Sequence, residues 1–267
     1  PADHGLGPIR AVHSLPYLRF LESAHRRWQA VGEDWGEEVI SNIFVRSPNA
    51  LRGILAEAAR YLADGSAPVG KHTWQAAYWS AQSALSGADL VHGGEQAVYV
   101  LSRPPGHHAF GDLAGGFCFL NNSGIAAEHL RKLGHRPAIL DVDVHHGNGT
   151  QGIFYERDDV LTVSIHADPI RFYPFYWGHA HERGEGAGRG YNLNLPLPRG
   201  TGDDAYLKAL DIAFERIAAF GTDALVIALG LDAHIDDPFK GLAVTTPGFA
   251  RIGAAIARRG ALGFETH

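Results

Sequence analysis

The chain has 267 residues, 45% of them hydrophobic and 19% charged, a composition that fits one large α/β domain with a buried core. Its net charge of −6 argues against nucleic acid as a partner and is compatible with cationic substrates. The single cysteine, Cys118, excludes an intramolecular disulfide framework and indicates a reducing cytoplasm. Neither a membrane span nor a signal peptide is expected.

The first part of the chain is predicted to be helical. Apolar periodicity predicts helices over residues 17–28, 47–65 and 73–85, each bounded by glycine or proline. His13, just before the first of them, is interpreted as a packing or capping residue. The third helix carries aromatic side chains at a spacing typical of a core or a subunit contact: Trp74, Tyr78 and Trp79.

Residues 97–101 predict a buried strand, which is followed by Pro-Pro-Gly and then by His107 and His108. Because Pro-Pro-Gly cannot continue a strand, it should hold the two histidines in a rigid loop at the strand end. Paired imidazoles there could serve as general base and general acid, although a solvated pair could also be accidental. A helix over 123–133, capped by Asn121 or Asn122, comes next.

The stretch 138–151 carries the strongest chemical signal in the sequence. A short apolar strand over 138–142 leads into Asp141, Asp143 and His145, which alternate and therefore share one side of an extended backbone. Two carboxylates and an imidazole on one face favour a bound cation. Oxygen and nitrogen ligands without thiolate suit a catalytic zinc site or a similar divalent ion. The alternative is a buried salt-bridge cluster.

The rest of the chain continues the alternation of strands and helices. A strand over 160–165 ends near His166, and residues 172–177 form an aromatic loop that should line a pocket or an interface. A helix over 203–220 precedes a strand over 224–229, after which Asp232 and His234 follow. A last helix is predicted over 247–259.

This alternation predicts a mostly parallel sheet with helices on both faces, in a single domain. Four polar clusters follow four predicted strands: His107/His108, Asp141/Asp143/His145, His166, and Asp232/His234. Ligands of open α/β sheets bind beyond the carboxyl ends of the strands, so we expect the four clusters to meet at that edge.

At this point four motifs resemble those of the zinc-dependent histone deacetylase superfamily. They lie in residues 103–109, 116–122, 141–151 and 230–234, and the resemblance extends over roughly residues 12–260. Within the superfamily the chain looks most like bacterial acetylpolyamine amidohydrolases, through segments 17–23 and 154–157 and the helical insertion before Thr73 and Trp74. The resemblance implies the arginase/deacetylase fold.

The resemblance also implies roles for individual residues. Zinc, with Fe²⁺ as the alternative in the cell, would be bound by Asp143, His145 and Asp232. His107 and His108 would be the acid/base pair. Asp141 would orient His107, and Asn148 stands where some family members place an aspartate opposite the second histidine.

Further implied positions concern structural ions and the substrate channel. A structural potassium ion would be held by Asp141, Ser164 and Ile165 with the carbonyls of Asp143 and His145. A second monovalent site would involve Phe154, Arg157, Val160 and Tyr191. Gly116, Phe117 and Tyr173 would line the substrate channel, with the two aromatic rings as its facing walls.

The residues support the same chemistry without the family. Three hard ligands leave an open zinc position for water and a substrate carbonyl. A neutral His107 or His108 would take the water proton, and the protonated one would deliver a proton to the leaving amine. Asp141, behind them, would tune their basicity. The products would be acetate and a free amine.

One family element has no match. The family's last strand carries Glu-Gly-Gly-Tyr, whose tyrosine donates to the oxyanion, and no tyrosine in this sequence matches it. Loss of one such donor typically costs ~10²–10³ in rate. We therefore expect residues 1–267 to form a single deacetylase-like catalytic domain from which N- and C-terminal parts of the family domain are missing.

The leading hypothesis is deacetylation of small N-acetylated amines or polyamines. The helical segment 48–71 favours this substrate class and a homodimer. Neither nucleic acid nor membrane is expected as a partner. Acidic side chains there, Glu57 and Asp64, could meet a distal ammonium or simply be solvated. The alternatives are deacetylation of acetyl-lysine in proteins, an arginase-like dimanganese reaction suggested by residues 232–236, and a catalytically impaired metal-binding module.

Overall fold

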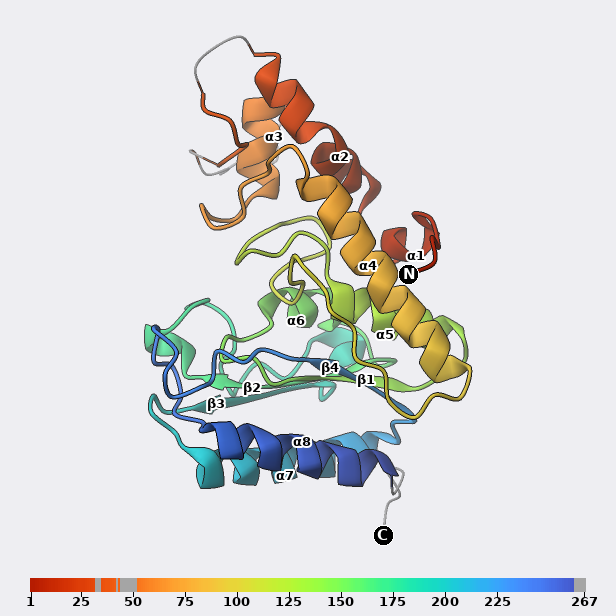
Figure 1. Ribbon diagram of the computed structural model, residues 1–267, viewed down its shortest axis with the longest axis vertical. Coiled ribbons are helices and arrows are strands. Elements are labelled where there is room, and N and C mark those ends of the chain that lie inside the picture. The colour runs from red at the N-terminus through yellow and green to blue at the C-terminus, as the bar shows by residue number, and fades with distance from the viewer. Residues whose placement is uncertain (32–34, 42, 44–51, 262–267) are drawn as a thin grey trace.

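The computed structural model describes residues 1–31, 35–41, 43 and 52–261. Four strands form one fully parallel sheet in the order β3-β2-β1-β4. Their bounds are β1 Pro137–Asp141, β2 Leu161–Ala167, β3 Asn192–Leu197 and β4 Ala224–Ala228. Helices cover both faces of the sheet, as the alternating pattern predicted (Figure 1).

One face is covered by α7 (Asp203–Phe220) and α8 (Thr246–Ala261), and the other by α5 (Asn122–Lys132) and α6 (Asn148–Phe154) (Figure 1). Strand alternation explains the division. Leu140 packs in the cluster that contains Leu210 and Phe214 of α7, whereas Ile139 packs with Phe154 of α6. Every residue of β1 and β2 is consequently buried.

A second layer of helices lies over the α5 side of the sheet (Figure 1). It comprises α1 (Gly7–Arg10), α2 (Leu15–Gln29), α3 (Ile54–Tyr61) and α4 (Thr73–His92), which share a separate apolar core. Two short 3₁₀ turns complete the elements, η1 (Pro169–Arg171) and η2 (Gly186–Gly188). No helix in the described part of the chain is long and apolar enough to cross a membrane.

The predicted bounds of α3 and α4 were partly wrong. Residues 44–51 lie outside the described residues, but Gly53 has φ +83 and the helix begins only at Ile54. It ends at Tyr61 because Leu62 turns extended and bridges Ala114. Helix α4 continues past the predicted end at Leu85 to His92.

The predicted buried strand over 97–101 was also wrong. The stretch alternates as a strand does, with Val98 and Val100 inward, and Val100 packs against Gly87 of α4. Tyr99 and Leu101, however, are 72% and 81% exposed. The segment pairs with no strand among the described residues, so it does not join the sheet. Sequence periodicity reports which side chains point inward but cannot report a pairing partner.

His13 links the helical layer to the sheet. Its side chain is buried, and its Nε2 accepts the backbone N–H of Asn121, which in turn caps α5 by accepting from Gly124 N–H. The capping role expected for Asn121 is therefore confirmed. Burial lowers the pKa of His13 to about 4, because a charged imidazole would lose its hydration there.

We predict an acid-sensitive contribution to stability from His13. Because its folded pKa is below the value of 6.5 in the unfolded chain, the unfolded state binds more protons between pH 6.5 and 4, and stability falls as pH falls through that range. Between pH 7 and 5 the loss should be about 2 kcal/mol. Urea unfolding of the wild type and of His13→Gln at both pH values checks it. An equal loss in the two proteins would contradict the assignment.

Candidate active site

Three candidate metal ligands converge at the carboxyl edge of the sheet. Asp143 and His145 follow β1, and Asp232 follows β4, the neighbouring strand. Each offers one ligand atom within 4.8 Å of the others. His145 Nδ1 lies 3.1 Å from an Asp143 oxygen and 3.0 Å from an Asp232 oxygen. The period-two pattern of the sequence thus continues past the strand end into a compact N/O donor set.

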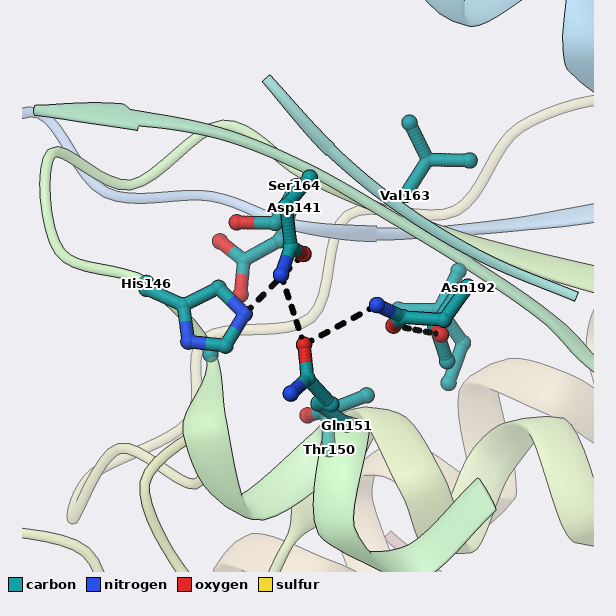
Figure 2. A pocket seen from close by; sticks show the side chains of 11 residues that line it. Asp141, His146, Thr150, Gln151, Val163, Ser164 and Asn192 are labelled. Atoms are coloured by element: carbon teal, nitrogen blue, oxygen red, sulfur yellow. Dashed lines mark hydrogen bonds between the residues drawn. The ribbon is translucent and has the colours of Figure 1, made fainter. Parts of the chain in front are cut away.

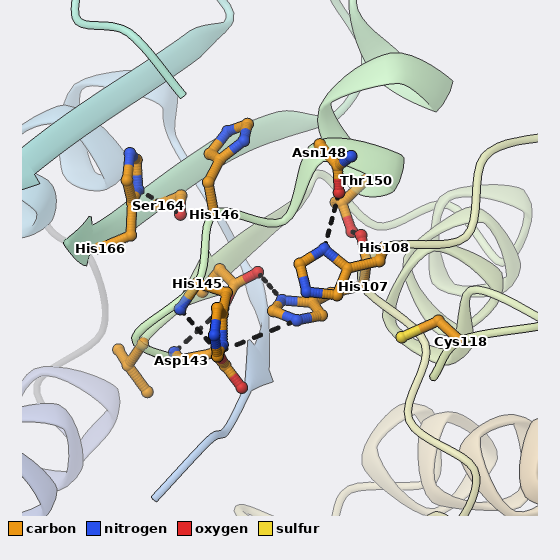
Figure 3. A network of polar contacts seen from close by, with 12 residues as sticks. His107, His108, Cys118, Asp143, His145, His146, Asn148, Thr150, Ser164 and His166 are labelled. Atoms are coloured by element: carbon orange, nitrogen blue, oxygen red, sulfur yellow. Dashed lines mark hydrogen bonds and ion pairs between the residues drawn. The ribbon is translucent and has the colours of Figure 1, made fainter. Parts of the chain in front are cut away.

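The two histidines lie beside this set, with ring centroids 4.0 Å apart (Figure 3). His107 Nδ1 lies 2.8 Å from Asp141 Oδ2, and its Nε2 lies 3.9 Å from Asp143 Oδ1. His108 Nδ1 lies 2.7 Å from Asn148 Oδ1. In each ring Nδ1 is therefore occupied by a partner, which fixes the orientation of the imidazole.

The loop that carries the histidines is packed backbone to backbone against α6. A Cβ at Gly149, in the first turn of α6, would collide with the backbone of His108 and Ala109. Only glycine allows this close approach. The Thr150 N–H also donates to the His107 carbonyl at 3.1 Å. The site is thus held by main-chain contacts as well as by side chains.

The neighbouring charges give the two histidines different proton affinities. Burial opposes protonation of His107, but the Asp141 and Asp143 carboxylates raise its pKa to about 9. Burial and the adjacent His107 hold the pKa of His108 well below its usual range, and its partner Asn148 supplies no charge. The carboxylates therefore favour the cationic form of His107, and burial favours the neutral form of His108.

The candidate ligands show the electrostatics of a cation site. When no cation is bound, Asp143 and Asp232 outweigh burial and raise the pKa of His145 to about 9, so a proton takes the position between two carboxylates. The pKa of Asp143 is lowered, since the charges of His107 and His145 outweigh burial. A divalent ion would replace this proton with stronger charge neutralisation, so these residues fit a metal.

Two of the three predicted channel residues, Gly116 and Tyr173, lie next to His108. The Tyr173 ring stands perpendicular to the His108 ring, with centroids 4.9 Å apart. Gly116 lies between them, because a Cβ there would meet both His108 and the Tyr173 hydroxyl. Phe117 is 62% exposed at the tip of a turn and has φ +68.

Two of the residues predicted to hold potassium line a small polar cavity between the sheet and α6 (Figure 2). Asp141 and Ser164 are paired residues of β1 and β2 and both line it. Ile165 is the next residue of β2 and is buried. The Ser164 hydroxyl lies 2.8 Å from His166 Nδ1 (Figure 3). His166 was predicted to lie at the end of a strand over 160–165, but β2 continues to Ala167 and includes it.

The protein-family model for the histone deacetylase domain matches residues 4–261 of this chain. The chain belongs to the histone deacetylase domain family. Its order of motifs, its parallel sheet and its clustered histidines and carboxylates agree with the resemblance found in the sequence.

Within this family the chain is similar to acetylpolyamine amidohydrolases. It is 58% identical to that of Burkholderia pseudomallei (strain 1710b) over 256 residues, 96% of this chain and 75% of the relative. It is 47% identical to acetylpolyamine amidohydrolase 1 of Pseudomonas aeruginosa over 269 residues, 97% of this chain and 76% of the relative.

Solved structures give the same result. The crystal structure of acetylpolyamine aminohydrolase from B. pseudomallei matches with a TM-score of 0.93 and 59% identity, over 96% of this chain and 75% of that one. A histone deacetylase homolog from Aquifex aeolicus matches with a TM-score of 0.77 and 28% identity, over 94% of this chain and 62% of that one. The predicted arginase/deacetylase fold is confirmed.

Not every residue singled out in the sequence belongs to the site of this deacetylase-family chain. His234 was grouped with Asp232, but its Nε2 lies 3.0 Å from Thr246 Oγ1 at the start of α8, and its ring stacks on Phe249. Glu57, considered as an ammonium partner, instead forms two hydrogen bonds with Arg27.

Three residues of the site were missed or misjudged. Phe172 stacks on the His145 ring with centroids 5.0 Å apart and is buried. The aromatic loop was expected to line a pocket or an interface, but Phe172 was not singled out as a site residue. Phe239 lies 6.3 Å from the same ring, and nothing in its local sequence marked it. Asp64 contacts Tyr173 and Gly116. The sequence suggested Asp64 only as a possible ammonium partner. Its contact with Tyr173 spans 109 residues, and local sequence patterns cannot predict such a contact.

Proposed function

We propose that this chain is a zinc-dependent amidohydrolase that removes acetyl groups from small N-acetylated amines, acetylpolyamines in particular. The observation that carries the proposal is the placement of the Asp143, His145 and Asp232 set beside a histidine pair, with His107 Nε2 3.9 Å from Asp143. The names of relatives at 58% and 47% identity support the substrate class.

Asp143, His145 and Asp232 would hold the metal. Two carboxylates and one imidazole are hard ligands that leave a coordination position open, as catalytic zinc sites do, and Fe²⁺ also suits such a set. When bound, the metal would polarise the amide carbonyl and lower the pKa of a bound water. The same ligands argue against a purely structural role, which in zinc proteins favours thiolates and a closed site.

The histidine pair would move the protons. His108, whose Nδ1 faces the neutral amide of Asn148, is suited to take a proton from the attacking water. His107, whose Nδ1 faces the Asp141 carboxylate, is suited to carry the proton that the leaving amine needs. Hydrolysis would then yield acetate and the free amine, with both protons passing through Nε2 atoms.

Three further parts of the proposal concern assembly and ions. Residues 1–267 would act as a single catalytic domain of a longer family fold. A potassium ion would sit beside Asp141, Ser164 and Ile165, with the Asp143 and His145 carbonyls as further ligands. A homodimer would form through the helical layer, where Trp79 of α4 is 45% exposed. Titration with K⁺ and sedimentation analysis test the last two.

The deciding experiment is turnover by the zinc-reconstituted chain of N-acetylputrescine against an acetyl-lysine peptide. Hydrolysis of the small amine supports the proposal. Activity on the peptide alone would assign the chain to protein deacetylation. Binding of a hydroxamate with no turnover of either substrate would favour a metal-binding relative that lacks the oxyanion tyrosine.

A further inference from the structure

The wall of the site next to His108 is a tight turn from Gly115 to Cys118. These two residues exchange both backbone hydrogen bonds, at 3.1 and 2.8 Å, so Gly116 and Phe117 are the two residues of the loop between them. Both have positive φ, +52 and +68, as type I′ turns require. Phenylalanine rarely adopts this conformation, so the turn needs support from its surroundings.

Asp64 supplies that support. Its Oδ2 accepts the Gly116 N–H at 3.2 Å and the Tyr173 hydroxyl at 2.8 Å. One carboxylate oxygen therefore holds both the turn that carries Phe117 and the aromatic ring beside His108. Burial and this hydrogen bond raise the pKa of Tyr173, so its hydroxyl stays a donor.

Asp64 itself is held rigidly. Its Oδ1 accepts both the N–H and the hydroxyl of Ser66, at 3.0 and 2.6 Å. The preceding residues are tied to the strand-like stretch before the turn, through Ala63 N–H to Ala114 O at 2.7 Å and Ala114 N–H to Tyr61 O at 2.8 Å. The segment after α3 and the turn thus move as one unit.

The same contacts separate two possible roles of this carboxylate. A carboxylate offers about four lone-pair directions, and Asp64 already accepts four hydrogen bonds. A substrate ammonium would have to displace one of these donors. A positioning role needs no such displacement and uses every contact present.

We propose that Asp64 is a positioning residue that sets the width of the substrate channel by holding Tyr173 and the Gly116–Phe117 turn at a fixed separation. The proposal rests on the amidohydrolase function above. Asp64 contacts neither the candidate metal ligands nor His107. Replacing it should therefore affect how the substrate is held more than it affects the chemical step.

The test compares Asp64→Asn, Tyr173→Phe and the double variant with wild type, all reconstituted with zinc. Asparagine keeps the size of the Asp64 side chain, but its single oxygen cannot accept hydrogen bonds both from Ser66 and from Gly116 and Tyr173. Phenylalanine keeps the ring of Tyr173 but removes the hydroxyl that donates to Asp64. We expect each single variant to raise KM for N-acetylputrescine about tenfold, with kcat within about threefold of wild type. The double variant should raise KM by much less than the product of the two single-variant increases, because both substitutions remove the hydrogen bond between Tyr173 and Asp64.

Glu57→Gln is the matched control. Glu57 lies in the neighbouring α3, is bonded to Arg27 and has no contact with the channel, so its variant reports on general loosening of this segment. It should leave KM unchanged. The dissociation constant of a fluorescent aryl hydroxamate, measured on each zinc-loaded variant, gives a readout without turnover and should rise in parallel with KM.

The outcomes separate this inference from the proposed function. Wild-type activity with unchanged KM and hydroxamate affinity in Asp64→Asn would overturn the positioning role, as would fully multiplicative effects in the double variant. If wild type hydrolyses neither amide, the proposed function fails, and the hydroxamate affinities alone still decide whether Asp64 shapes the channel.

Discussion

Replacing Asp232 by Asn, or His145 by Ala, is expected to lower kcat/KM for an acetylated amine by about 10³-fold or more. Metal polarisation of a carbonyl contributes several kcal/mol, and each ~1.4 kcal/mol corresponds to a tenfold change in rate. With one of three ligands gone, the remaining pair would no longer hold the ion at a fixed position beside His107. Metal analysis of the purified variants should show a parallel loss of bound zinc.

Asp236→Asn provides the control for this experiment. Asp236 is on the same loop as Asp232, its side chain is 88% exposed, and its Oδ2 lies 3.7 Å from His234 Nδ1. Its variant should keep both zinc and activity. Full activity in Asp232→Asn with zinc still bound would contradict the ligand assignment, whereas recovery of activity by chelated wild type on adding zinc would support it.

Replacing His108 by Ala is expected to lower kcat by about 10²–10⁴-fold while zinc stays bound, the usual contribution of a general acid–base group. His181→Ala, which removes an exposed imidazole, is the control and should leave kcat unchanged. A His108→Ala protein with normal kcat would show that the proton leaves the water by another route.

The pH profile distinguishes the two histidines. Asn148→Asp places a carboxylate 2.7 Å from His108 Nδ1 in place of the amide oxygen, which should raise the pKa of His108. If His108 must be neutral to accept a proton, the acid limb of kcat/KM against pH should move to higher pH. A limb that does not move would assign the base role to His107.

Three of the four strands were predictable because they depend on local patterns, whereas no strand was predicted where β3 lies. Uninterrupted apolar runs gave β1, β2 and β4 to within two residues at either end, and α7 was predicted over its observed range. The stretch 97–101 shows the limit of this reasoning. Its alternation is real, since Val98 and Val100 point inward, yet a strand exists only where a second strand supplies hydrogen bonds.

The site was predictable where its residues share one short segment. Asp143 and His145 are two positions apart, so the strand period alone brings them together. Asp232 and His234 satisfy the same rule, and only the structure separates the residue that turns towards the site from the one that packs on α8. Phe239 and Asp64 reach the site through loop conformations that no period encodes.

The main-chain contact between Gly149 and the histidine loop has a consequence for how this scaffold can change. The histidines proposed to transfer protons lie on a loop whose backbone leaves no room for a Cβ at Gly149, so we expect a substitution at that glycine to displace them. Asp64, Tyr173 and Phe239 lie on three separate loops and reach the site through their side chains. Engineering a new amide preference should therefore randomise these loops and leave residues 106–109 and 141–151 untouched.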